Sequence, residues 1–299
     1  MTIPTGYNRT ARYFVPARYN PEDGRTLPEA VKATTHMSFG AHQDDAEIMA
    51  YHGIALCFLD PEKWFSSVIM TDGSGSPSEG GPYSAFSKEQ MGERRTEESW
   101  AVAMAGRYAF TGAMNYPSGV MKDRAQQKPT TDIRNLLLLS QPEVVYTHTP
   151  TDKHDTHVAV VGRTVRALRD LAKTGEYKPQ RVLGCEVWRF NDWIDDADPH
   201  KVQLDTSALP NLREALLSIY DSQIAGRGPG GNAYDLATVG LGHANAVYAQ
   251  SHDVQEAQSV TNALNLMPLI EDPAMGIDTF VQERIASFSH DVATRLQGW

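Results

Sequence analysis

The sequence predicts an α/β protein in which a mainly parallel sheet carries helices on both faces. Apolar runs of strand length alternate with segments of helical periodicity through about residue 190. The chain has 299 residues, 41% of them hydrophobic and 21% charged, which is enough for one large soluble domain with a sizeable core.

The elements are expected in this order. Strands are predicted at 34–39, 64–71, 108–110, 143–147, 181–190 and 202–204. Helices are predicted at 44–59, 88–105 and 132–139, and again from about 158 and from about 211. The helix at 88–105 has the clearest limits, because Ser87 and Gln90 make a capping box and Gly106 follows its last turn.

Three regions follow from this pattern. Residues 1–30 are polar and rich in Pro and Gly, and we expect an irregular N-terminal arm that packs on the body through its aromatic side chains. Residues 31–225 form the predicted main domain. Residues 226–299 are less regular and are expected to be an extension packed on the same domain. The Gly-rich loop at 226–231 reads equally well as a mobile lid and as a plain surface loop.

Composition excludes several classes of function. The net charge is −10 without a basic cluster, which argues against nucleic-acid binding, whereas the acidic balance does not identify a substrate and mainly favours solubility. No run is apolar enough to cross a membrane, and the N-terminus lacks the apolar core of a signal peptide, so we expect a cytoplasmic protein. Cys57 and Cys185 lie in apolar runs and are expected to be buried thiols. The composition and the net charge are compatible with a homo-oligomer.

One short stretch places an imidazole and two carboxylates where the first strand turns into a helix. These are His42, Asp44 and Asp45. Open α/β sheets bind ligands at the carboxyl ends of their strands. Acidic residues at a helix start can also do no more than stabilise its unpaired N–H groups. Alone, therefore, this motif favours a functional and a structural reading about equally.

A second cluster follows the strand at 143–147. Residues 148–157 hold three histidines and two aspartates, and in a parallel sheet this strand end lies at the same edge as the first motif. A catalytic zinc commonly takes two histidines and one carboxylate and leaves a position for water, while a further carboxylate can accept the proton of that water. A solvated loop with Thr156 as a helix cap is the alternative, but two such loops rarely converge without a function.

Five motifs resemble those of the PIG-L/LmbE-like family of zinc-dependent deacetylases that act on N-acetylglucosamine-type sugars. They are Ala41-His42-Gln43-Asp44-Asp45-Ala46-Glu47, Thr71-Asp72-Gly73, the Gly92/Arg95/Glu98 pattern, His154-Asp155-Thr156-His157 and Ser222-Gln223. The first four follow the family's order and cover about residues 34–170. The resemblance implies a Rossmann-like fold and hydrolysis of an N-acetyl group from an amino sugar or its glycoside.

The resemblance also implies roles for individual residues. His42, Asp45 and His157 would bind one zinc ion per chain, although other divalent metals would suit nitrogen and oxygen ligands. Asp44 would be the general base for the attacking water. His154 would stabilise the oxyanion or protonate the leaving amine.

Three substrate contacts are expected as well. The resemblance implies that Arg95 lines the substrate pocket. We place Asp72 on a loop at the substrate side. Trp188, with Trp193 and Tyr234, would either stack on a sugar ring or be ordinary packing.

The chain departs from the family pattern at three places. One is Asp152, which stands two residues before the H-P-D-H motif, where some members have a tyrosine that helps to bind the oxyanion. Gln43 replaces the usual proline of the first motif. In the H-P-D-H motif, Asp155 and Thr156 stand where the family has proline and aspartate. This leaves open which of Asp152, Asp155 and His148 orients a ligand histidine.

Two other functions fit part of this pattern. One is a zinc amidase of the same fold that cleaves a non-sugar or thiol-conjugate amide. The other is a sugar-binding module without turnover, although such a module would not need Asp44. The loop at 73–76 lacks the third glycine of a dinucleotide-binding motif, so a dehydrogenase is not favoured.

Overall fold

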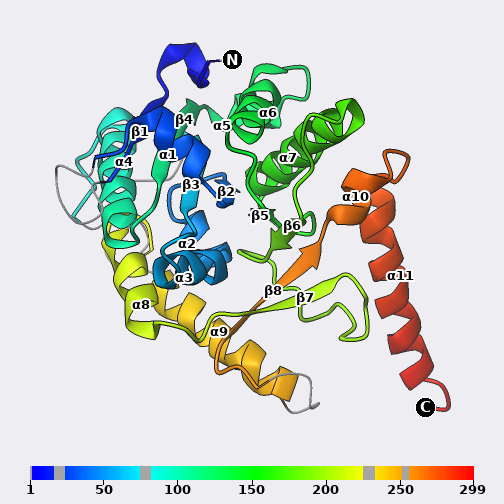
Figure 1. Cartoon of the computed structure of the whole chain (residues 1–299). Coiled ribbons are helices and arrows are strands. Elements are labelled where there is room, and N and C mark those ends of the chain that lie inside the picture. Colours follow the sequence, from blue (N-terminus) through cyan, green and yellow to red (C-terminus); the bar gives the residue numbers. More distant parts are fainter. Residues whose placement is uncertain (1, 17–23, 75–81, 225–232, 251–255) are drawn as a thin grey trace.

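The computed structural model describes residues 2–16, 24–74, 82–224, 233–250 and 256–299. They form an eight-stranded sheet in the order β1-β4-β3-β2-β5-β6-β8-β7 (Figure 1). The strands are β1 (Arg12–Phe14), β2 (His36–Gly40), β3 (Phe65–Thr71), β4 (Phe110–Tyr116), β5 (Val144–His148), β6 (Arg181–Cys185), β7 (Lys201–Asp205) and β8 (Val260–Asn265).

The centre of the sheet is parallel and its margins are antiparallel. Strands β4, β3, β2, β5 and β6 run in one direction, whereas β1 at one edge and β8 near the other run against their neighbours. Every residue of β2, β3 and β5 is buried, as expected for parallel strands covered on both faces. The predicted fold class is confirmed.

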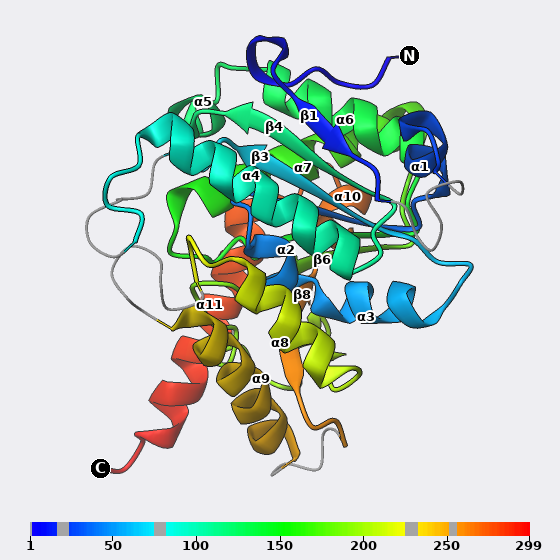
Figure 2. The ribbon, with the colours of Figure 1, turned by 90° about the vertical axis from the view of Figure 1, so that its left-hand side faces the viewer.

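Helices cover both faces of this sheet, as Figure 2 shows with α4 on the near side and α6 and α7 on the far side. One apolar core joins the sheet to α1, α5, α6, α7 and α10, and the other joins it to α2, α3, α4 and α8. The helices are α1 (Leu27–Ala33), α2 (Asp45–Met49), α3 (Tyr51–Leu59), α4 (Lys88–Ala105), α5 (Ser118–Lys122), α6 (Lys128–Ser140), α7 (Asp155–Thr174), α8 (Pro210–Ile219), α9 (Tyr234–Gln250), α10 (Met267–Glu271) and α11 (Ile277–Arg295).

Several expectations about single elements were wrong. The N-terminal arm contains β1, which is too short to show periodicity and extends the sheet by pairing with β4. The helix expected at 44–59 is interrupted at Ala50, where φ is −117°. The weak strand at 108–110 is replaced by the seven-residue β4, whose Gly and Asn residues hide its strand character. Helix α5 was not expected, and the strand at 181–190 ends at Cys185.

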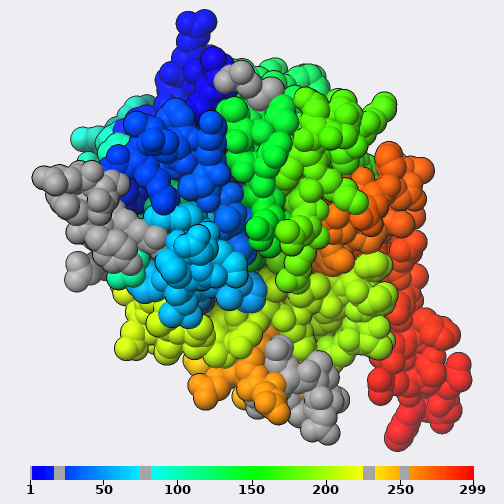
Figure 3. Space-filling view, in the orientation of Figure 1, coloured from blue at the N-terminus to red at the C-terminus, as the bar shows by residue number. Residues whose placement is uncertain are grey.

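The last third of the chain contributes to the sheet. Strand β8 lies between β6 and β7, so the chain returns to the sheet after α9. Helix α11 projects from the body and carries the C-terminus (Figures 1 and 3). Cys57 and Cys185 are buried free thiols, as predicted. The Gly-rich loop at 226–231 lies outside the described residues. No described helix has the length and apolar composition needed to cross a membrane.

Candidate metal centre

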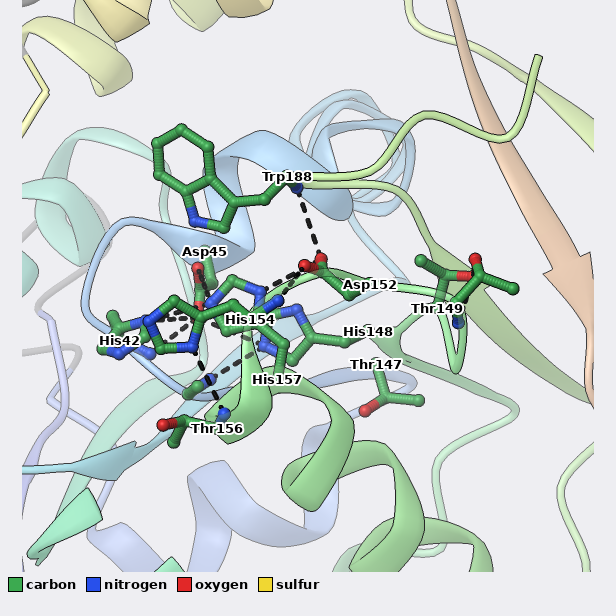
Figure 4. Close-up of polar contacts among 12 residues, drawn as sticks. His42, Asp45, Thr147, His148, Thr149, Asp152, His154, Thr156, His157 and Trp188 are labelled. Atoms are coloured by element: carbon green, nitrogen blue, oxygen red, sulfur yellow. Dashed lines mark hydrogen bonds and ion pairs between the residues drawn. The ribbon is translucent and has the colours of Figure 1, made fainter. Parts of the chain in front are cut away.

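The two predicted clusters meet at the carboxyl edge of the sheet. His42 and Asp45 follow β2, His148 ends β5, and His157 lies in the first turn of α7 (Figure 4). Strands β2 and β5 are paired neighbours, and this brings residues more than 100 positions apart into contact. Thr71 at the end of β3 secures the turn after β2, because its N–H and hydroxyl both donate to the carbonyl of Ala41.

The three residues predicted to bind metal converge on one point. His42 Nδ1 lies 3.0 Å from His157 Nε2 and 3.5 Å from Asp45 Oδ2, and His157 Nε2 lies 3.5 Å from Asp45 Oδ1. In a tetrahedral zinc site with bonds of 2.0–2.1 Å, ligand atoms stand roughly 3.3–3.4 Å apart. The two Asp45 distances run to different carboxylate oxygens, so the separations match the overall size of such a site rather than one exact set of ligand atoms. The donor chemistry fits a divalent metal. Metal binding by these residues stays a prediction.

Asp152 orients His157, the buried histidine that is predicted to bind metal. His157 Nδ1 lies 3.1 Å from Asp152 Oδ2, and the same carboxylate accepts from the backbone N–H groups of His154 and Trp188. With its proton on Nδ1, His157 presents the lone pair of Nε2 to the cluster. Burial lowers the pKa of His157 to about 4, so the ring is neutral at neutral pH, as a metal ligand must be. The partner that sequence analysis left open is thus Asp152.

His148 is a second histidine in contact with Asp45. Its Nε2 lies 3.2 Å from Asp45 Oδ2, and the backbone N–H of Ala41 points to the same nitrogen at 3.0 Å. Burial alone would raise the pKa of Asp45, but His157 and His148 hold it well below its ordinary range. Asp45, His148 and His157 therefore form an overlapping group that could also hold a metal. Sequence analysis named His148 only as an orienting residue.

Asp44, the predicted base, is buried beside the cluster. Its Oδ1 accepts a hydrogen bond of 3.1 Å from Gln223 Nε2, which belongs to the predicted Ser222-Gln223 motif. Burial and the adjacent Asp45 raise the pKa of Asp44 to about 6, against the opposing charges of His42 and Arg95. A carboxylate of that basicity suits proton transfer near neutral pH.

His154 lies on the exposed side of the cluster. Its ring and that of His42 meet edge to face, with centroids 4.9 Å apart. His154 Nδ1 accepts from the backbone N–H of Thr156 at 3.2 Å, which caps α7. The neutral ring consequently carries its proton on Nε2, and that nitrogen is able to donate. This agrees with the predicted role as a proton donor. His154 also stands with His42 and His157 in a group whose ligand atoms are close enough to hold a metal, so the structure leaves both roles open to it.

Helix α4 connects the other family-like motifs. Arg95 is only 1% exposed, and its guanidinium donates to the carbonyl of Gly73 and, at 3.5 Å, to that of Ser222. Glu98, one turn further, accepts from both the backbone N–H and the hydroxyl of Ser222. Arg95 therefore holds the backbone of two loops that border the site. Direct contact of Arg95 with a substrate stays a prediction.

Asp72, the remaining predicted residue, lies in the loop after β3. This loop packs against Gln43. Asp72 accepts from the backbone N–H and hydroxyl of Ser74. Gly73 has φ of +67°, and a Cβ there would lie 2.5 Å from Gln43 Oε1, so this position requires glycine. The Gln43 amide is 1% exposed, and neither of its polar atoms has a hydrogen-bond partner among the described residues.

Trp188 borders both the cluster and a cavity of about 260 Å³. Its indole packs edge to face on Tyr234, with centroids 4.8 Å apart. Trp193 lies elsewhere, packed on Phe288 of α11. Of the three aromatic residues considered for sugar stacking, two are thus near the site, and stacking itself stays a prediction.

Comparison with known proteins places the cluster inside a recognised family region. Residues 37–168 match the PIG-L family, described as GlcNAc-PI de-N-acetylase. This region contains His42, Asp44, Asp45, His154 and His157. A comparison with curated proteins gave no match.

Solved structures share the fold at low sequence identity. A 4-carboxy-2-hydroxymuconate hydratase from Pseudomonas putida KT2440 has 15% identity and a TM-score of 0.57, over 78% of this chain and 96% of that one. N,N'-diacetylchitobiose deacetylase from Pyrococcus horikoshii has 14% identity and a TM-score of 0.56, over 79% and 86%. The zinc-inhibited form of a teicoplanin deacetylase has 14% identity and a TM-score of 0.52, over 78% and 98%.

Proposed function

The chain carries a PIG-L-family domain, and from that premise we propose that it is a metal-dependent hydrolase that removes an N-acetyl group from an N-acetylated amino sugar or its glycoside. One observation carries the proposal: His42, Asp45 and His157 converge within 3.5 Å of one another, and Asp44 is adjacent to them in the chain. Two of the structural neighbours, which are deacetylases by name, support it at the level of the fold.

Amide hydrolysis requires an activated water, a polarised carbonyl and a proton donor for the leaving nitrogen. A divalent metal bound to the cluster would supply the polarisation and would lower the pKa of a coordinated water. The donor set of two imidazoles and a carboxylate fits zinc, and the same atoms suit other first-row metals.

The protein's own groups would handle the protons. Asp44 accepts the proton of the attacking water, and Gln223 holds that carboxylate in position. His154 donates from Nε2 to the leaving nitrogen, while Thr156 fixes its ring through Nδ1. Asp152 keeps His157 in the tautomer whose Nε2 faces the cluster.

Acetate release from a panel of N-acetylated amino sugars and their glycosides tests this proposal, with and without a chelator. We expect release that the chelator abolishes and that added zinc restores. Cleavage of only non-sugar or thiol-conjugate amides would instead support the amidase alternative. Binding of the sugars without any release would support a binding module. A hydratase shares this fold, so the fold alone does not establish amide hydrolysis. The absence of any amide cleavage would therefore refute the proposal.

A further inference from the structure

A largely apolar cavity lies between α8, α9 and the end of β6, beside the metal centre. It measures about 260 Å³. Its apolar lining comes from Ile48, Val187, Trp188, Phe190, Leu241 and Val260. Helix α9 and strand β8, which supply two of these side chains, lie outside the family-matched region. The cavity is thus built largely from parts of the chain to which the family match assigns nothing.

The cavity shares its wall with the metal centre. Lys153, which lines it, stands between Asp152 and His154 in the chain. The backbone N–H of Trp188 donates to Asp152, and Ile48 follows Asp45 by three residues on α2. The cluster and the cavity are therefore adjacent, as a ligand that reaches from one to the other requires.

A buried cation also lines the cavity. Arg213 is 4% exposed, and its two hydrogen bonds, to Thr206 Oγ1 at 3.3 Å and Ser259 Oγ at 2.9 Å, both leave from Nη1. Its Nε has no partner, and no described carboxylate forms an ion pair with it. A contact with the ring of Tyr51, 5.4 Å from its centroid, offsets part of the burial cost. A buried charge without an ion pair is costly, and an anionic ligand would compensate it.

Glu186 supplies the carboxylate in the cavity wall, and both of its oxygens already accept hydrogen bonds from other groups. Glu186 Oε2 accepts from the backbone N–H of Asn191, and Oε1 accepts from Asn245 Nδ2 and the backbone N–H of Asn262. Glu186 thus does not neutralise Arg213 by direct contact, and Lys153 adds a second cation to the same wall.

We propose that this cavity binds an apolar substituent of the amide substrate and that Arg213 recognises an anionic group carried by that substituent. The assignment to a substrate rests on the proposed function, whereas the binding itself does not. An apolar cavity of roughly 150 Å³ holds benzene, so the present volume suits a chain of roughly eight carbons. The favoured substrates are then amides with a hydrophobic, acid-bearing arm rather than simple N-acetyl sugars.

Calorimetric titration with octanoate and with 1-octanol tests the proposal without any turnover. We expect octanoate to bind at least about tenfold more tightly than octanol, because a charge-assisted hydrogen bond accounts for a difference of that size. Ala237 lines the cavity from α9 and is itself exposed, so Ala237→Phe obstructs the cavity from the solvent side and should weaken octanoate binding by at least about tenfold. Leu236→Phe is the matched control, since Leu236 is the neighbouring residue, is 70% exposed and does not line the cavity. Arg213→Met should abolish the preference for octanoate.

The outcomes separate this inference from the proposed function. Equal binding of the two ligands, or octanoate binding that survives Ala237→Phe, would overturn it; the second result would place the ligand elsewhere, the metal cluster included. If Arg213→Met fails to fold, the comparison of Ala237→Phe with Leu236→Phe still decides whether the cavity is the site. If the protein binds octanoate in the cavity but cleaves no amide, the proposed function is refuted and the binding site in the cavity still stands.

Discussion

At the scale of single residues, each functional side chain of the proposed centre uses one polar atom in a hydrogen bond to a neighbouring group. His157 gives Nδ1 to Asp152, His154 gives Nδ1 to a backbone N–H, and Asp44 is held by Gln223. Each engagement leaves one specific atom available for chemistry. These partners orient the functional groups, so their loss should change affinity or rate more than folding.

Asp152→Asn should weaken metal binding by about 10–100-fold, because the amide cannot replace the carboxylate that fixes the His157 tautomer. Competition with a chelator of known affinity measures the effect. Asp155→Asn is the matched control, since Asp155 is exposed and belongs to the same segment. Equal metal affinity in wild type and Asp152→Asn would show that Asp152 does not support the metal site.

The buried Glu186 gives a pH-dependent contribution to stability. Burial raises its pKa from the ordinary 4.5 to about 7 in the folded protein, despite three donors around it. The stability that this group contributes is therefore fully present below pH 4.5 and is lost as the pH rises through about 7. Between these values the slope is about 1.4 kcal/mol per pH unit.

Denaturant unfolding of wild type and Glu186→Gln at several pH values tests this contribution. Because glutamine does not titrate, the stability of wild type relative to the variant should decline from about pH 5 to pH 8. A constant difference across this range would mean that Glu186 has its ordinary pKa in the folded state.

Some residues of the site could be predicted from sequence and others could not. His42, Asp44, Asp45 and His157 occupy strand ends and helix starts, where the chain direction fixes which residues meet. The choice of Asp152 over Asp155 as the partner of His157 depends on the path of the loop from 149 to 154, which no periodicity encodes. The burial of Arg95 depends on the packing of α4 against segments about 20 and about 127 residues away.

At the scale of elements, α4 links three segments that surround the site. Arg95 bonds to the loop after β3, and Glu98 bonds to Ser222, whose neighbour Gln223 holds Asp44. Both ends of this helix could be predicted from sequence, because the capping box at its start and Gly106 at its end are local signals. Sequence analysis missed β8, since the pairing of β8 with β6 and β7 depends on contacts that span about 60 to 80 residues.

Glu98→Gln tests the link from α4 to the base. Loss of the Glu98 carboxylate weakens the hold on Ser222 and displaces Gln223, so kcat should fall by about 10–100-fold while metal content stays unchanged. Glu97→Gln is the control, because that neighbouring side chain is 55% exposed and its closest approach to Arg94 is 3.9 Å. Equal kcat values for the two variants would argue against this link.

At the scale of the whole molecule, the proposed metal centre brings together the two ends of the stretch that matches the PIG-L family. His42 and Asp45 follow the first parallel strand, and His157 opens α7 about 115 residues later. A metal that binds only the folded arrangement would stabilise it in proportion to the logarithm of metal concentration over the dissociation constant.

Removal of the metal by a chelator should therefore lower the melting temperature by several degrees. A metal at 100 times its dissociation constant contributes about 2.7 kcal/mol. With an unfolding entropy of about 2.1 cal/mol/K per residue, a chain of 299 residues shifts by about 1.6 °C per kcal/mol. Differential scanning calorimetry of wild type and His157→Ala, each with and without chelator, measures this. The variant should show no chelator effect, and an equal shift in both proteins would place the metal elsewhere.

The most direct test of the central claim combines metal content and turnover in Asp44→Asn. The account predicts about one metal ion per chain, as in wild type, together with a loss of amide hydrolysis of at least about 10²–10⁴-fold, because the base is gone while the ligands remain. Full hydrolytic activity in this variant, with the metal retained, would contradict the assignment of Asp44 as the base and with it the proposed chemistry of the centre.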